Sequence, residues 1–197
     1  NSPYSTFTAN PFPDPSYNMI APFWADADTR DFSQTLGSGV LYKITPTAMI
    51  VKWENVGYFD MHFDKLNTFQ LIITDRTDTL LPAGKNVGFC YGNMQWTTGD
   101  ITGGGGFGSP ATVGVNQGNG IDYFQVGTFN QPTLAFDGPY NAPDGVDWLD
   151  NQGMYFNTSV SGNNIPPIII NNNICDTIDV YTGDTLRSVA TDSVEFL

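Results

Sequence analysis

The stretch Met49-Ile50-Val51-Lys52-Trp53-Glu54 decides the fold class of this chain. In an extended backbone, Met49, Val51 and Trp53 lie on one face and the three residues between and after them lie on the other. A period of two residues is typical of a half-buried β-strand. Because Trp53 shares its face with two other apolar side chains, it is predicted to belong to the hydrophobic core.

The same alternation recurs on both sides of this stretch, at residues 40–45, 69–74 and 87–92. An Asn119-Gly120 pair lies between two further apolar segments, residues 111–116 and 121–126, and such a pair supplies the positive φ values of a tight β-hairpin. No segment shows the 3.6-residue period of a long helix. Only one short helical turn is expected, at residues 60–66.

The composition favours strands that are joined by turns. The chain has 21 Gly, 13 Pro and 18 Asp, but only 2 Glu. Aspartate competes for backbone hydrogen bonds in helices, whereas turns accommodate it well. The predicted fold is therefore all-β, an antiparallel β-sandwich with long Gly/Asp-rich loops in which Trp24 and Trp96 are also buried.

The charge of the chain limits its partners. Its 197 residues include 7 Lys and Arg against 20 acids, so the net charge is −13. This charge argues against nucleic acids and anionic membranes as partners. No apolar stretch has the length of a membrane span, so no membrane insertion is expected.

The chain divides into three parts by composition. Residues 1–16 contain four prolines and are predicted to form an extended lead-in. Residues 17–160 carry the strand patterns and are predicted to form one β domain. Residues 161–197 begin with a linker-like segment around Pro166-Pro167; they either add strands to the main sheet or begin a following module.

Five segments resemble, in order, the nidogen-like (NIDO) domain family of extracellular matrix and cell-surface proteins. They are Ile20–Asp26, Val51–Tyr58, Asn67–Ile72, Gln95–Gly99 and Pro110–Gly114. The resemblance implies an extracellular or cell-surface β-rich module that adheres to a matrix protein, a cell-surface protein or a glycan. It implies no catalytic residues. Residues 175–186 of the tail resemble the start of repeated immunoglobulin-like modules in large bacterial surface proteins, so a bacterial adhesin and an animal matrix protein both stay open.

Two groups of acids are candidate calcium sites. Asp26 and Asp28 lie two residues apart, so on a strand both would offer carboxylate oxygens to calcium from one face. Against this, Arg30 stands where a further ligand would, and the acids can instead accept backbone hydrogen bonds at a strand end. The second group surrounds Trp148 and consists of Asp137, Asp144, Asp147 and Asp150. Turn formation explains this group equally well.

Two further features concern covalent chemistry. Cys90 and Cys175 are the two cysteines, and they form either one disulfide, as expected in a secreted protein, or two thiols. Asn157-Thr158-Ser159 is an N-glycosylation sequon, which matters only on a eukaryotic secretory route.

A second class of function is a carbohydrate-binding module, with or without calcium, that uses Tyr123, Phe124 or Tyr140 as stacking platforms. An enzyme has less support. His62 is the only histidine and has no nucleophile motif beside it. The glycine-rich stretch at residues 103–108 lacks the lysine and the helix of a phosphate-binding loop, and is expected to fold against the sheet with Phe107 as its anchor.

Overall fold

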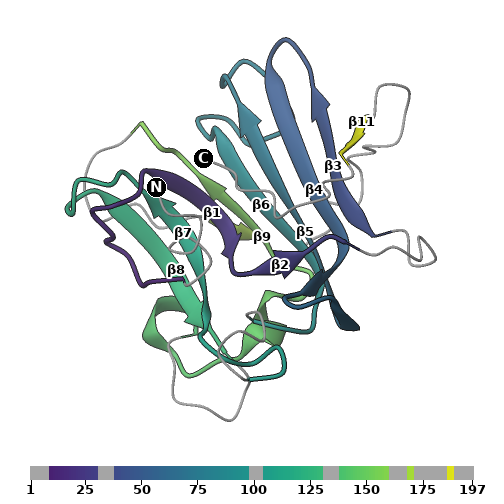
Figure 1. Cartoon of the computed structure of the whole chain (residues 1–197). Coiled ribbons are helices and arrows are strands. Elements are labelled where there is room, and N and C mark those ends of the chain that lie inside the picture. The colour runs from purple at the N-terminus through teal and green to yellow at the C-terminus, as the bar shows by residue number, and fades with distance from the viewer. Residues whose placement is uncertain are drawn as a thin grey trace.

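In the computed structural model the described residues are 9–30, 38–97, 104–130, 138–159, 168–170 and 186–188. They form two antiparallel β-sheets that face one another across a hydrophobic core (Figure 1). No α-helix occurs among these residues, which contain only two short 3-10 helices, η3 (Pro139–Asn141) and η4 (Val146–Leu149). The predicted all-β sandwich is confirmed.

The larger sheet has the strand order β10-β9-β6-β5-β4-β3-β11, with β2 paired to β4 beside this path. Its strands are β2 (Ala27–Asp28), β3 (Gly39–Ile44), β4 (Ala48–Tyr58), β5 (His62–Thr74), β6 (Val87–Met94), β9 (Gly153–Phe156), β10 (Ile168–Ile170) and β11 (Leu186–Ser188). The long β4–β5 hairpin forms its centre. The four alternating segments of the sequence thus lie on the neighbouring strands β3, β4, β5 and β6.

The smaller sheet has the order β1-β7-β8, formed by β1 (Met19–Trp24), β7 (Ala111–Asn116) and β8 (Tyr123–Phe129). The predicted β7–β8 hairpin is confirmed, but its connection spans residues 117–122 rather than a tight Asn-Gly turn. Asn119 Oδ1 accepts the backbone N–H groups of Ile121 and Asp122 at 2.9 and 2.7 Å. This side chain supplies the bonds of the turn, so the strand begins later than the pattern predicts.

Aromatic side chains from both sheets fill the core. Phe23 of β1 packs against Phe69 of β5 with ring centroids 5.4 Å apart, and against Trp96 at 5.5 Å. The Tyr91 hydroxyl donates a hydrogen bond to the Pro22 carbonyl at 2.6 Å, which joins the two sheets by a buried polar contact. Trp24 and Trp96 are both buried, as predicted.

The structure corrects the placement of Trp53. Trp53 does share its face with Met49 and Val51, but it is only partly buried and stacks on Phe69 at 4.8 Å. The smaller sheet lies over β5, β6 and β9 and leaves the face of β3 and β4 open on one side (Figure 1). A correct face assignment therefore did not ensure full burial.

The expected helical turn at residues 60–66 is wrong. The strand β5 begins at His62, which pairs with Tyr58 across the tight Phe59-Asp60-Met61 turn. Met61 has a φ of +58°, which reverses the chain within a hairpin. The strand pairing of β4 and β5 continues almost to the turn, so no residues remain for a helix.

Two segments of the C-terminal part add short strands to the larger sheet. β10 pairs with β9, and β11 pairs with β3. The residues between these strands lie outside the described part, and the division into three parts stays a prediction. In the described residues no helix has the length and apolar character that crossing a membrane requires.

Candidate functional site

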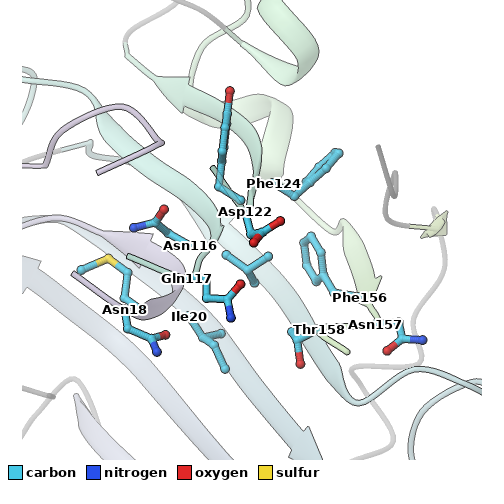
Figure 2. A pocket seen from close by; sticks show the side chains of 12 residues that line it. Asn18, Ile20, Asn116, Gln117, Asp122, Phe124, Phe156, Asn157 and Thr158 are labelled. Atoms are coloured by element: carbon cyan, nitrogen blue, oxygen red, sulfur yellow. The ribbon is translucent and has the colours of Figure 1, made fainter. Parts of the chain in front are cut away.

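A pocket of about 280 Å³ lies where β1, the β7–β8 hairpin and the end of β9 meet (Figure 2). Its apolar lining comes from Ile20, Val115, Phe124 and Phe156. The rings of Phe124 and Phe156 have centroids 6.0 Å apart, and the two side chains lie on the same side of the pocket. The pocket thus opens between the two sheets at one end of the sandwich.

Polar side chains surround this apolar lining. They are Asn18, Asn116, Gln117, Asp122, Asn157 and Thr158. The twelve lining residues include one carboxylate and no lysine, arginine or histidine. The pocket therefore offers amide, hydroxyl and carboxylate groups beside the aromatic side chains of Tyr123, Phe124 and Phe156, and its lining residues carry no cation.

Neighbouring residues hold these polar groups in place. The Asn86 side chain, which is buried, donates to Thr158 Oγ1 at 2.7 Å and accepts the Thr158 N–H at 2.9 Å. The Asn119 amide donates to Asp122 Oδ2 at 2.7 Å. Because these bonds within the protein hold Thr158 and Asp122, a ligand would need little further ordering of the two side chains.

The sequon asparagine lies on the rim of the same pocket. Asn157 Oδ1 accepts the Ser159 N–H at 3.0 Å, and Arg76 Nη2 lies 3.4 Å from the same oxygen. Arg76 approaches from outside and does not line the pocket. Glycosylation of Asn157 stays a prediction, and a glycan there would stand at the mouth of the pocket.

A row of apolar side chains leads across the larger sheet toward the pocket. Strand pairing places Ile44, Met49, Ile73, Val87 and Phe156 side by side on the inner face. Ile44 is 66 % exposed and Met49 is 37 % exposed, whereas Val87 and Phe156 are buried. We call the exposed end of this row, formed by Ile44, Met49 and the half-buried Ile73, the apolar edge.

The structure brings Asp26 and Asp28 together with Arg30 at the turn between β4 and β5. Asp28 is buried, and both of its oxygens accept hydrogen bonds from the Arg30 guanidinium. Asp28 Oδ2 also accepts the Met61 N–H at 2.9 Å. Burial opposes ionisation of Asp28, but these bonds outweigh it and lower its pKa below the usual value.

Asp26 has the opposite electrostatic environment. Burial, together with repulsion by the Asp28 carboxylate, raises the pKa of Asp26 to about 6, although Arg30 acts against this shift. Among the described residues no three His, Cys, Asp or Glu side chains lie close enough together to hold a metal ion. Calcium binding at Asp26 and Asp28 stays a prediction.

Replacing Asp26 by asparagine is expected to stabilise the protein at pH 7 by roughly 1 kcal/mol, after allowance for its partial exposure. A raised pKa means that the folded state disfavours the Asp26 carboxylate, so stability falls as pH rises from about 4 to 6. Thermal melts of parent and Asp26→Asn should differ by about 2–4 °C at pH 7 and converge near pH 4. Melts in millimolar calcium test whether Asp26 and Asp28 bind this ion. A calcium site would stabilise the parent, so that the parent would then melt at a higher temperature than Asp26→Asn.

The second candidate calcium site is the group of acids around Trp148. Its described members, Asp144, Asp147 and Asp150, do not converge on a common point that could hold an ion. Asp144 and Asp147 are exposed, and Asp150 Oδ1 accepts the Met94 N–H at 2.8 Å. Trp148 stacks on Phe129 with ring centroids 5.9 Å apart. Asp137 lies outside the described residues. The contacts seen are those of a turn beside the core.

The remaining candidates have structural contacts. Cys90 is buried on the outer face of the larger sheet and is disulfide-bonded. Cys175, the only other cysteine of the chain, lies outside the described residues, so the pairing of the two stays a prediction. His62 stacks on Tyr58 at 4.7 Å.

The described part of the glycine-rich loop folds against the sheet. Gly106 accepts the Thr97 N–H at 2.8 Å and has a φ of +87°. A Cβ atom at this position would lie 3.2 Å from the Tyr58 ring, which explains the need for glycine. Lys65 Nζ lies 5.6 Å from the centroid of Phe107, the predicted anchor.

Sequence reasoning found Phe124 and Tyr123 but missed most of the pocket. Ile20 and Phe156, which both line it, are far apart in the sequence and come from different sheets. Asp122 was visible only as a residue of the Asn-Gly hairpin. The side chain of Tyr140, the third proposed stacking platform, lies outside the described ones.

Comparison with known proteins gave one result. The family model described as "Nidogen-like domain" matches residues 41–137. No curated protein and no solved structure matches the chain. Four of the five segments that carried the resemblance lie inside the matched residues, and Ile20–Asp26 precedes them as β1 and the start of the next loop. Residues 41–137 of the chain therefore match a nidogen-like (NIDO) domain.

Proposed function

We propose that this protein is a non-catalytic extracellular module that adheres to a matrix or cell-surface protein as part of a larger surface protein. The observation that carries the proposal is the nidogen-like match over residues 41–137, since this family consists of matrix and cell-surface modules. The bonding of the titratable groups agrees with a binding role. Asp28, Asp64 and His62 all contact neighbouring side chains within the fold.

The apolar edge is the surface that we assign to the protein partner. Ile44 and Met49 are directly opposite one another on β3 and β4, and Ile73 is opposite Met49 on β5. Exposed apolar side chains that adjoin one another mark protein contacts more often than scattered ones do. Because the chain has a net charge of −13, the partner that complements it presents an apolar contact among basic residues.

A solid-phase binding screen against purified matrix and cell-surface proteins tests this proposal. Ile44→Asp combined with Met49→Asp is expected to weaken binding of the partner by at least about tenfold, because a charge replaces buried apolar contact. Ile121→Asp is the matched control, since Ile121 is 65 % exposed but lies on the β7–β8 connection. Equal binding by the double variant and the parent would refute the assigned surface.

The salt dependence of the same binding tests the charge argument. Binding to a basic partner should weaken as sodium chloride is raised from 50 to 300 mM, because salt screens attraction between surface charges. Binding that is unchanged over this range would contradict a basic partner.

A further inference from the structure

We infer that the pocket between β1, the β7–β8 hairpin and the end of β9 binds one uncharged sugar residue of a glycan. This inference rests on the proposed function, because it names a glycan on the adhesion partner as a second point of contact.

The size suits a single ring. A volume of about 280 Å³ lies at the lower end of ligand pockets, below that of a drug-sized molecule. It is therefore large enough for one sugar ring with its hydroxyl groups, while the rest of a glycan would extend into solvent.

The lining matches both sides of a sugar ring. The half-buried Phe124 presents an apolar ring against which the C–H face of a sugar can pack, and the buried Phe156 lies behind it in the pocket wall. Gln117 and Thr158 supply groups that both donate and accept hydrogen bonds, and the Asp122 carboxylate accepts two or more bonds from hydroxyl groups. A purely apolar side chain of a protein would form no hydrogen bonds with these polar groups.

The absence of cations among the twelve lining residues argues against an anionic ligand. Phosphate, sulfate and carboxylate groups are bound by Arg, Lys or several backbone N–H groups. This pocket instead carries Asp122, and the whole chain has a net charge of −13. These negative charges would repel sialylated or sulfated sugars. They would not weaken the binding of an uncharged sugar.

The polar groups are already in position. Asn86 fixes Thr158 by two hydrogen bonds, and its own N–H donates to the Phe156 carbonyl at 3.0 Å. Asn119 fixes Asp122 at the tip of the hairpin. Thr158, after β9, and Asp122, before β8, are therefore two fixed hydrogen-bonding groups on either side of the pocket. Their separation determines which spacing of sugar hydroxyl groups can bond to both, and this spacing differs among sugar stereoisomers.

Titration of the ¹⁵N-labelled full chain, followed by its amide resonances, tests the inference. The probes are the methyl glycosides of glucose, galactose, mannose, fucose and N-acetylglucosamine, with methyl glucuronide and galactose 6-sulfate as anionic counterparts. At least one uncharged glycoside is expected to shift the amides of residues 115–124 and 156–158 saturably. The anionic counterparts should shift these amides less.

Substitutions of single residues test whether the glycoside binds in this pocket. Asp122→Asn and, separately, the exposed Gln117→Ala should each raise the Kd of that glycoside about tenfold or more, whereas the exposed Asp144→Asn should leave it unchanged. Gln117→Ala keeps the test valid if Asp122→Asn disturbs the hairpin. Unchanged affinity in both pocket variants would overturn the inference.

Two other outcomes would also overturn it. One is that no uncharged glycoside shifts these amides; the other is that N-acetylphenylalanine amide shifts them and the glycosides do not, which would assign the pocket to a protein side chain. Neither outcome touches the proposed function if the parent still binds a deglycosylated matrix protein. The proposed function would instead be refuted if the parent bound none of the matrix and cell-surface proteins in the screen.

Discussion

Trp96→Ala is expected to lower the free energy of unfolding by about 3–5 kcal/mol, the largest effect of any tryptophan in the chain. Trp96 is fully buried between the sheets and packs against Phe23 and Tyr58. Its indole N–H donates to the Val56 carbonyl at 3.0 Å. The substitution therefore removes a large core side chain and leaves a buried carbonyl without that bond.

Urea unfolding of Trp96→Ala, Trp53→Ala and the parent checks this expectation. Trp53 is the matched control, because it has the same side chain in the same sheet region but is only partly buried. Trp53→Ala should cost clearly less than Trp96→Ala. The reverse order would contradict the placement of the core.

Asn67→Ala is expected to cost a similar amount, about 3–5 kcal/mol, although it removes a polar side chain. The fully buried Asn67 side chain accepts the N–H groups of Gln95 and Trp96 at 2.6 and 3.1 Å and donates to the Trp96 carbonyl at 2.8 Å. These bonds hold the chain as it leaves β6. Without them, buried backbone groups lose their partners, which is costly in a low-dielectric core.

The control for this variant is Asn93→Ala, which removes the same side chain from an exposed position on β6. Its effect should stay within about 0.5 kcal/mol. Chemical denaturation of both variants gives the comparison. A stability of Asn67→Ala close to that of the parent would show that water or a rearranged loop replaces these bonds.

The strands were predictable from the sequence because a period of two is a local property. Val87, Phe89 and Tyr91 face the core as their alternation indicates. The period of two does not give the depth of burial, because depth depends on which strands the second sheet covers. Trp53 and Met49 have the right face but lie on β4, which the smaller sheet leaves open on one side. The burial of Trp96 was predicted, but it does not follow from the period of two, because Trp96 comes just after a strand.

The candidate site was predictable only in pieces. Phe124 and the Asn-Gly hairpin are visible in the sequence, but the pocket needs β9, whose position follows from pairing with β6. Asn86 carries no local signal, since its role is to hold Thr158 across a distance of 72 residues in the chain. The buried role of Asn67 is likewise a product of tertiary structure, although the residue lies within a segment of the nidogen-like resemblance.

Saturation binding of the purified chain to the matrix and cell-surface proteins selected by the screen tests the central claim most directly. The account predicts that at least one of them binds saturably with a Kd of about 10 μM or below, the range of specific if transient contacts. It also predicts that the Ile44→Asp, Met49→Asp double variant binds more weakly and that Ile121→Asp binds like the parent. Binding that never saturates, or that all three proteins show equally, would contradict the claim that this nidogen-like domain is an adhesion module.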